Sequence, residues 1–268
     1  MKPLKQHGYE YYDLADILHD SYSEADLAAL TAAFDDLPAD DYAPDLNRYR
    51  QYGRAVIFPG THRIEWLPET VKNNKSYYDY FQGSFNPEYP DASRRFPAIP
   101  EHVRHNRLLE ALIAFNFRQT FWTREDALMP FHAGVHFVKL HVESEEDEAF
   151  SSPNTLHQDG EPFTFAHLIR RRNIEGARNV ISVPEVRGRM PEDVDREKIT
   201  DSFYMTRPLE SYGVYDPLVT HYVGSVRKGP EDGPGERSAI LIDYQPTVVA
   251  NPDEIRSMHG DTNNMDYV

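Results

Sequence analysis

The sequence predicts a mainly β protein with flanking helices, in which short antiparallel strands form a double-sheet barrel or sandwich. From Gly134 onward, short runs of strand-like composition alternate with turn signals. The 20 prolines and 14 glycines supply many turns, which favours a strand-rich architecture. A helical N-terminal region precedes these runs, so we expect helices packed outside the sheets. The expected strands are VHFVKLHVE, FTFAHLI, NVISV, YGVYDPLV, HYVGSV and RSAILIDY.

The first 45 residues are predicted to be helical. Apolar residues between Tyr11 and Leu18 keep a spacing of three to four, which indicates one helix. Ser23 is a suitable N-cap for a second helix, EADLAALTAAFDDL, because its hydroxyl can accept a hydrogen bond from a free backbone N–H of the first turn.

Two further elements precede the strand-rich half. The segment Asn47–Pro59 alternates basic and apolar residues, which indicates a strand. The apolar stripe of His105–Phe121 predicts a helix packed on a sheet. We find no internal repeat and no linker rich in Gly or Ser, so we expect one domain. Its expected parts are a helical region (1–45), a core with supporting helices (46–250) and a tail (251–268) within the single domain 1–268.

Composition and charge limit the partners and the chemistry. A chain of 268 residues with 40% hydrophobic residues can form a globular core. The net charge of −16 argues against binding to nucleic acid or to anionic membranes, both of which require basic patches. Without cysteine, metal ligands must come from His, Asp and Glu. Since no run of about 18 apolar residues occurs, we expect a cytoplasmic protein. We expect small molecules as its partners and leave open whether it forms a homo-oligomer.

The stretch SSPNTLHQDGEPFTFAHL contains the first part of a metal-binding pattern. His157 and Asp159 are two residues apart, so on an extended strand both side chains point to the same side. His221 lies at the start of a later strand and would complete a set of two histidines and one carboxylate, which is typical of non-haem Fe(II) oxygenases. Arg237 begins the following strand, where a guanidinium could bind a carboxylate of 2-oxoglutarate.

These segments together resemble the family of Fe(II)/2-oxoglutarate-dependent dioxygenases typified by bacterial L-isoleucine 4-hydroxylase. The resemblance begins with SSP-xx-LH-x-D-x-EP-xx-F-x-HL, read here as SSPNTLHQDGEPFTFAHL, and continues through RRRNIEGARNVIS, HYVGSV and ERSAILIDY. Upstream, RYRQYGR resembles an R-x-R-x-Y-x-R motif of the same proteins. It covers roughly residues 45 to 247.

The resemblance implies a double-stranded β-helix and an oxygenase that hydroxylates a free L-amino acid. It makes His157, Asp159 and His221 the Fe(II) ligands and Arg237 the residue that binds 2-oxoglutarate. The other co-substrate is O₂, and ascorbate is expected to support activity in vitro. Related halogenases have a small residue at the position of Asp159, so an aspartate here favours hydroxylation.

Four residues are candidates for binding the substrate. Arg50 and Arg54 share a strand face with Arg48, and one of them could bind an α-carboxylate; pairing with surface acids is the alternative. Glu161 could accept a substrate ammonium or only brace its loop. Lys139 stands where the family has arginine, beside a phenylalanine that replaces glutamine, so the resemblance leaves polar and basic amino acids open.

Two other functions remain open from the residues alone. A metal-dependent hydrolase or isomerase could use the same three ligands on Zn(II) without needing Arg237. A non-catalytic binding module would require the ligands to be vestigial. Histidines elsewhere are interpreted as structural or as supporting the site: His132, His136, His141 and His167.

Overall fold

The computed structural model describes residues 3–81, 93–151 and 153–247, and the tail expected for residues 251–268 lies outside them. The helices are α1 (Pro3–His7), α2 (Leu14–Ile17), α3 (Glu24–Ala32), α4 (Glu101–Arg104) and α5 (Arg107–Gln119). The strands of the first half are β1 (Tyr9–Asp13), β2 (Arg48–Ile57), β3 (Ile64–Trp66), β4 (Thr70–Lys72), β5 (Lys75–Phe81) and β6 (Ser93–Pro97). Those of the second half are β7 (Phe131–Val142), β8 (Glu148–Ala149), β9 (Phe163–Arg172), β10 (Ile174–Gly176), β11 (Asn179–Ser182), β12 (Ile199–Phe203), β13 (Glu210–Tyr215), β14 (Thr220–Val223), β15 (Val226–Lys228) and β16 (Gly235–Pro246).

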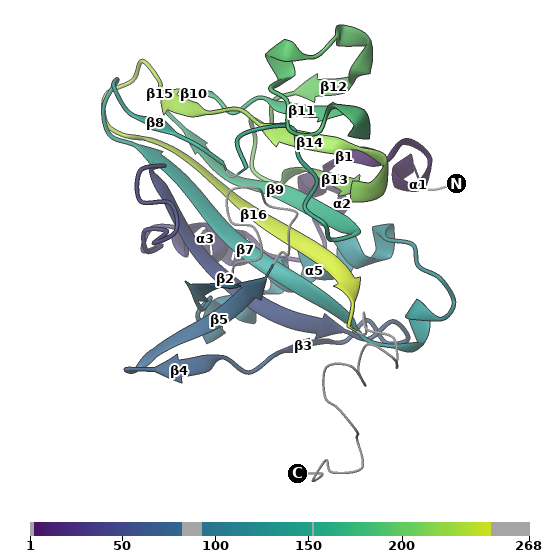
Figure 1. Cartoon of the computed structure of the whole chain (residues 1–268). Helices are drawn as coiled ribbons and strands as arrows, with labels where there is room; N and C mark the ends of the chain where they lie inside the picture. The colour runs from purple at the N-terminus through teal and green to yellow at the C-terminus, as the bar shows by residue number, and fades with distance from the viewer. Residues whose placement is uncertain (1–2, 82–92, 152, 248–268) are drawn as a thin grey trace.

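A seven-stranded antiparallel sheet forms the centre of the molecule, in the order β1-β13-β9-β16-β7-β2-β3 (Figure 1). The long strand β16 pairs with β7 on one side and with β9 on the other, so the last described strand lies in the middle of the sheet. The remaining strands form three smaller sheets, in the orders β10-β15-β8, β12-β11-β14 and β4-β5-β6. The prediction of a mainly β protein with flanking helices is confirmed.

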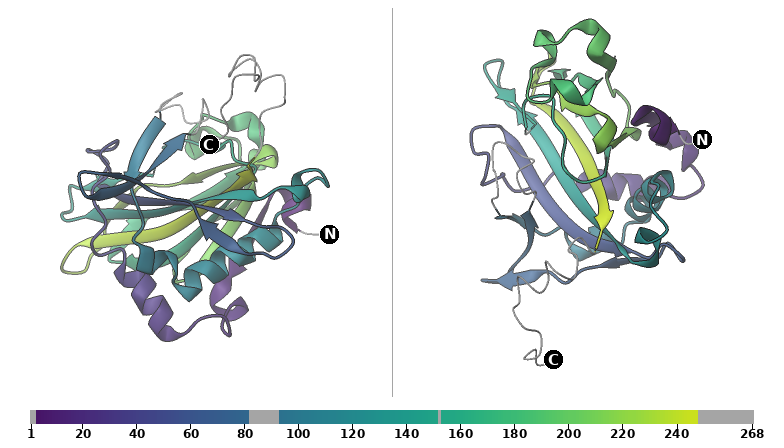
Figure 2. Two further views of the ribbon diagram at one scale, coloured as in Figure 1. Left: turned by 90° about the horizontal axis from the view of Figure 1, so that it is seen from below. Right: turned by 45° about the vertical axis from the view of Figure 1, so that its right-hand side comes forward.

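The helices cover one face of the large sheet (Figure 2). Side chains on that face, such as Phe137 of β7 and Ile240 of β16, belong to the same buried cluster as Leu108 and Leu112 of α5. Asn106 caps α5 by accepting hydrogen bonds from two backbone N–H groups of its first turn, as its sequence position allows. None of the described helices is both long and apolar enough to cross a membrane.

The opposite face of the large sheet carries both apolar and polar residues, and part of it packs on the smaller sheets. Because side chains alternate along a strand, the residues between those that pack on α5 point away from the helices. His136 of β7 and Leu241 of β16 are cross-strand neighbours on this face, and Tyr52 of β2 continues the row. Tyr52 packs with aromatic residues of β5 and β6, whereas Leu241 packs toward the cluster that contains Ile181 of β11.

The helix predicted for Tyr11–Leu18 is wrong over its first half. Residues Tyr9–Asp13 form β1, which pairs with β13 at the edge of the large sheet. Aromatic residues favour strands, and the edge position lets polar side chains of YEYYD remain accessible. The N-cap predicted at Ser23 is confirmed, because its hydroxyl accepts from the backbone N–H of Asp26 in a capping box.

Buried His167 should make the fold sensitive to acid. Nε2 of the imidazole lies 2.9 Å from the amide nitrogen of Asn116, and Nδ1 lies 2.8 Å from Oγ of Ser211. Burial lowers the pKa of His167 to about 3, from 6.5. Between these two values the unfolded chain binds a proton that the folded chain excludes, so the free energy of unfolding falls as the pH falls through this window.

We expect His167→Gln to remove this contribution, which amounts to about 2–3 kcal/mol over two pH units. Urea unfolding at a series of pH values between 7 and 4.5 measures it as a shallower pH slope. The same replacement at exposed His102 is the control. A His167→Gln protein with the wild-type slope would contradict the prediction.

Candidate functional site

Two segments far apart in sequence are held side by side by backbone hydrogen bonds. The N–H of His157 donates to the carbonyl of His221 at 3.0 Å, and the N–H of His221 donates back to the carbonyl of His157 at 2.9 Å. His221 also belongs to β14, where it pairs with Ile181 of β11. The backbone therefore fixes the separation of the two imidazoles before any ligand binds.

The three predicted metal ligands converge. Oδ1 of Asp159 lies 3.6 Å from Nε2 of His157, and Oδ2 lies 3.3 Å from Nε2 of His221. One ligand atom from each residue lies within 4.8 Å of the other two. Both histidines are buried, and the carboxylate is half-buried.

The protonation states of His157 and Asp159 suit a metal ion. Nδ1 of His157 donates to the carbonyl of Thr155 at 2.7 Å, which leaves the lone pair of Nε2 facing Asp159. Burial, assisted by His221, lowers the pKa of His157 to about 4, so its imidazole is neutral at pH 7. Burial would raise the pKa of Asp159, but His221 and His157 lower it below its usual value. For His221, burial would lower the pKa but Asp159 raises it above its usual value, so a metal would displace any proton on that imidazole. Neutral imidazole and ionised carboxylate are the forms that bind Fe(II), so this donor set fits that ion.

Asp216 supports the loop that carries Asp159. Its two carboxylate oxygens accept hydrogen bonds from the backbone N–H groups of Asp159 and Gly160, at 3.0 and 2.9 Å. Its carbonyl accepts from the side-chain amide of Gln158 at 2.6 Å. Asp216 begins a one-turn 3-10 helix just before the strand of His221, so one residue links both halves of the site. We did not predict this role; the Asp-Pro turn before the His221 strand is the only signal in the sequence.

Arg237 of β16 is buried, with 5% of its surface exposed. It pairs across the sheet with Leu140 of β7 and Arg171 of β9. Among the described residues no carboxylate forms an ion pair with it, and burial lowers its pKa to about 10. Burial raises the pKa of Tyr212 to about 12, with opposing effects of Arg237 and Asp159, so this tyrosine lies within electrostatic range of both.

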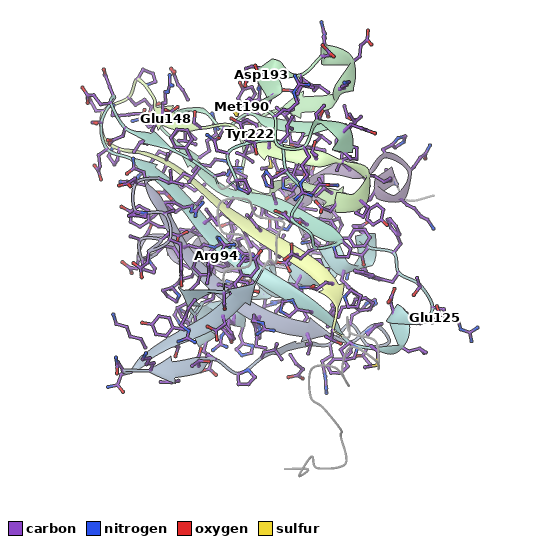
Figure 3. The ribbon with its side chains drawn as sticks, viewed as in Figure 1. Arg94, Glu125, Glu148, Met190, Asp193 and Tyr222 are labelled. Atoms are coloured by element: carbon purple, nitrogen blue, oxygen red, sulfur yellow. The ribbon has the colours of Figure 1, made fainter. Side chains whose placement is uncertain are left out.

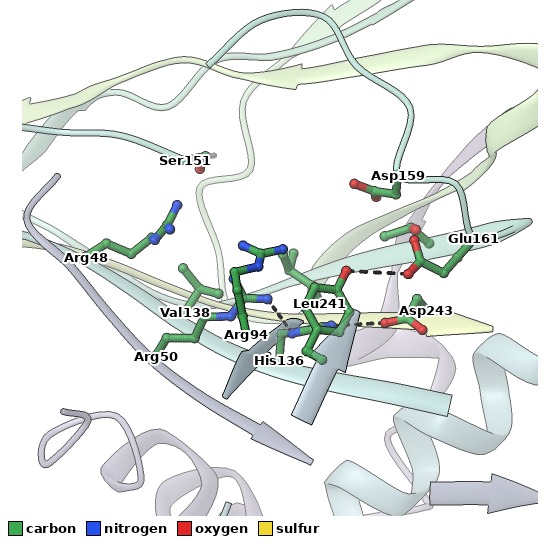
Figure 4. Close-up of a pocket in the computed structure, with 12 residues that line it drawn as sticks. Arg48, Arg50, Arg94, His136, Val138, Ser151, Asp159, Glu161, Leu241 and Asp243 are labelled. Carbon is green, nitrogen blue, oxygen red and sulfur yellow. Dashed lines mark hydrogen bonds and ion pairs between the residues drawn. The ribbon is translucent and has the colours of Figure 1, made fainter. Parts of the chain in front are cut away.

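A cavity adjoins Asp159 and has charges of opposite sign at its two ends (Figure 4). Its lining also includes the apolar residues Val138 and Leu241. Figure 3 shows Arg94 in front of the middle of the large sheet. Arginines occupy one end and carboxylates the other: Arg48, Arg50 and Arg94 against Asp159, Glu161 and Asp243.

A chain of hydrogen bonds crosses the floor of this cavity. Nη2 of Arg50 lies 2.6 Å from Nδ1 of His136, and Nε2 of His136 lies 3.0 Å from Oδ2 of Asp243. Gly134 lies directly opposite Asp243 on β7, and a Cβ there would overlap the carboxylate. Glu161 accepts a 3.4 Å hydrogen bond from the hydroxyl of Tyr80.

The structure brings only part of the predicted substrate set to the cavity. Arg50 and Glu161 line it. Arg54 shares the strand face, as predicted, but its Nε donates to His132 at 3.1 Å and it lines a neighbouring hollow. His136 and Asp243 were not predicted to line the cavity, because their meeting depends on the register of three strands.

Lys139 does not reach the cavity. Its ammonium donates to the carbonyls of Phe34 and Asp35, at 2.8 and 3.2 Å, just past the end of α3. The neighbouring Phe137 stacks on Phe34, with ring centroids 4.8 Å apart. Both departures from the family pattern therefore lie on the helix-covered face, so they give no reason to expect an altered substrate.

Comparison with known proteins identifies related sequences. A family described as 2OG-Fe dioxygenase matches residues 31–243. A 3(1)-hydroxy-L-isoleucine 4-dioxygenase of Pantoea ananatis (strain AJ13355) is 26% identical over 253 residues, covering 90% of this chain and 93% of that protein. An L-isoleucine-4-hydroxylase of Bacillus thuringiensis is 29% identical over 138 residues, covering 50% of this chain and 54% of that protein.

Solved structures confirm the double-stranded β-helix. The crystal structure of IDO from Bacillus thuringiensis has a TM-score of 0.70 at 20% identity, covering 91% of this chain and 96% of that one. A bsmA homolog from Methylobium petroleophilum PM1 has a TM-score of 0.74 at 15% identity, covering 93% and 92%. At these identities the likeness concerns the fold alone.

Removing the support from Asp216 should weaken metal binding. We expect Asp216→Ala to lower the affinity for Fe(II) about 10- to 100-fold, because the loop of Asp159 loses both of its hydrogen-bond acceptors. Anaerobic calorimetry measures the affinity, and Asp195→Ala, at an exposed carboxylate, is the control. Wild-type affinity in Asp216→Ala would show that the loop holds its shape without this residue.

Proposed function

Because the chain belongs to the 2OG-Fe dioxygenase family, we propose that it hydroxylates an unactivated C–H bond of a free L-amino acid. Fe(II) and 2-oxoglutarate are the cofactor and co-substrate of the family, and the histidines and aspartate for the metal are present. Family membership favours this reaction over a hydrolase, an isomerase or a vestigial binding module. One oxygen atom of O₂ enters the amino acid, and the other enters succinate as 2-oxoglutarate loses CO₂.

The cavity with opposite charges is the observation that carries the choice of substrate. A free amino acid is a zwitterion, so it needs a cation for its carboxylate and an anion for its ammonium. Arg50 supplies the cation beside Asp159. Burial, together with Asp243 and Asp159, raises the pKa of Glu161 well above its usual value, and the ammonium of a bound amino acid would favour the anion there. The two relatives named above act on isoleucine or its hydroxylated form, which agrees with a small amino acid here.

The chemistry divides between the cofactor and the chain. Fe(II) with 2-oxoglutarate and O₂ supplies the oxidising power for the C–H bond. His157, Asp159 and His221 would hold the metal, and Arg237 would pair with the distal carboxylate of 2-oxoglutarate. Arg50 and the acids at the other end of the cavity would orient the amino acid toward the metal.

Incubation with Fe(II), ascorbate, 2-oxoglutarate and each common L-amino acid tests the proposal. Mass spectrometry should find the gain of one oxygen in at least one amino acid, with succinate formed in step. Asp159→Ala should abolish both products, because the metal would lose the one carboxylate that the described part of the chain offers it together with His157 and His221. If no amino acid gains oxygen, or if Asp159→Ala keeps full turnover, the proposal fails.

Replacement of Arg237 tests the co-substrate site. We expect Arg237→Gln to raise the KM for 2-oxoglutarate about 10- to 100-fold, as a charge-assisted hydrogen bond is lost, and Arg237→Lys to raise it less. Arg227→Gln, at an exposed arginine paired with Glu148, is the control. An unchanged KM in Arg237→Gln would place the distal carboxylate elsewhere.

A further inference from the structure

Resting on the proposed function, we propose that Arg50, His136 and Asp243 recognise the head group of an α-amino acid. Arg50 binds the carboxylate and Asp243, with Glu161 beside it, binds the ammonium. His136 is a positioning residue that sets the distance between the two charges. The proposal adds two residues, His136 and Asp243, to the substrate site and gives a physical reason for selecting α-amino acids.

The hydrogen-bond chain has one direction. A guanidinium can only donate, so Nδ1 of His136 must accept from Arg50 at 2.6 Å. The proton of the neutral ring is then on Nε2, which donates to Asp243 at 3.0 Å. Each outer residue is thus held by the same imidazole, and neither can turn away without breaking a buried hydrogen bond.

Aromatic packing fixes the imidazole. The ring of His136 stacks on Tyr52, with centroids 4.4 Å apart and planes 22° apart, and meets the edge of Tyr80 at 4.9 Å. The guanidinium of Arg50 lies 4.2 Å from the ring centre of Phe96. The three residues come from adjacent strands β2, β7 and β16 of one sheet, which are rigid supports for a binding site.

Residues at both ends of this hydrogen-bond chain, all of which line the cavity, have a buried polar atom without a hydrogen-bond partner. Nε of Arg50, Oδ1 of Asp243 and Oε2 of Glu161 are buried without a hydrogen-bond partner. Buried polar groups are normally paired, so such atoms gathered around one cavity indicate a missing ligand. Among the described residues, neither carboxylate forms an ion pair with Lys or Arg, and an arriving ammonium would supply that cation.

The spacing suits the α-amino acid head group. Two hydrogen bonds and the width of one five-membered ring separate Arg50 from Asp243. An α-amino acid bound alongside spans a similar length, two hydrogen bonds and the short N–Cα–C–O unit. A β-amino acid inserts one further C–C bond of about 1.5 Å, which the rigid pair cannot follow. The distance between the charges, rather than their number, therefore selects the substrate.

Substrate analogues test the two ends separately. The probes are the best amino acid of the panel, its desamino acid, its α-amide and its β-amino isomer. Calorimetry on the anaerobic protein with Fe(II) and 2-oxoglutarate measures binding. The wild type should bind the amino acid at least about 10-fold more tightly than each analogue. Asp243→Asn should lose the preference over the desamino acid, and Arg50→Gln the preference over the amide.

His136 is tested by two replacements. His136→Gln offers a hydrogen-bond acceptor and a donor in one side chain, so this variant should retain most of the affinity for the amino acid. His136→Phe keeps the stacking on Tyr52 but loses both hydrogen bonds, and should raise the KM for the amino acid about 10- to 100-fold. The KM for 2-oxoglutarate should stay within about twofold of the wild type in both variants. His141→Gln on the same strand is the control.

The outcomes separate this inference from the proposed function. If amino acids are hydroxylated but Asp243→Asn keeps the preference over the desamino acid, the ammonium lies elsewhere and the inference is wrong. If His136→Phe matches His136→Gln, or shifts both KM values equally, His136 has only a structural role. If the wild type neither binds nor hydroxylates any amino acid, the proposed function fails, and this inference fails with it.

Discussion

The two-residue alternation of β7 and β16 is the constraint on which the rest of the structure depends. One set of side chains, including Phe137 and Ile240, packs against α5, and the intervening set, including His136 and Asp243, lines the cavity. A shift of one residue in the pairing of these strands would exchange the two sets. Burial of the apolar face against the helices therefore fixes the register, and the register places the polar residues.

The cavity contains charges that the fold alone does not neutralise. Burying ionisable groups without partners is costly, and native structures do so mainly where a ligand completes them. Burial and the nearby Asp159 raise the pKa of Asp243 to about 7, while burial lowers that of Arg50 to about 10. At neutral pH the first shift leaves Asp243 partly protonated, whereas Arg50 keeps its charge. These buried groups lower the folding stability of the free protein, and a bound zwitterion that pairs with them would offset that cost.

Local patterns predicted many of the elements and the three residues that converge at the candidate metal site. His157 and Asp159 are two residues apart, and the prediction assumed that both lie on a strand. In the structure His157 forms an isolated β-bridge and Asp159 lies in the loop after it, where Asp216 holds the backbone. The N-cap at Ser23 and the helix around Leu112 depend only on neighbouring residues. The strand at Tyr9–Asp13 could not be predicted in this way, because its hydrogen-bond partners on β13 lie some two hundred residues later.

Contacts across strands were beyond prediction from one sequence. Lys139 and His136 are three residues apart on one strand, so they must point to opposite faces, but the pattern alone did not show which face holds the site. Asp243 meets His136 only because β16 enters between β7 and β9 in one particular register. The order of strands in the sheet, which no local signal specifies, decides which charges meet.

The position of Asp243 depends on Gly134 having no side chain. The carboxylate of Asp243 occupies the space that a side chain at this position would need. Replacing Gly134 by alanine would change no ionisable residue of the sequence, yet its methyl group would displace the carboxylate of Asp243. Attempts to redesign the specificity of this enzyme by exchanging charged residues should therefore keep glycine at position 134, because only glycine leaves space for the carboxylate of Asp243.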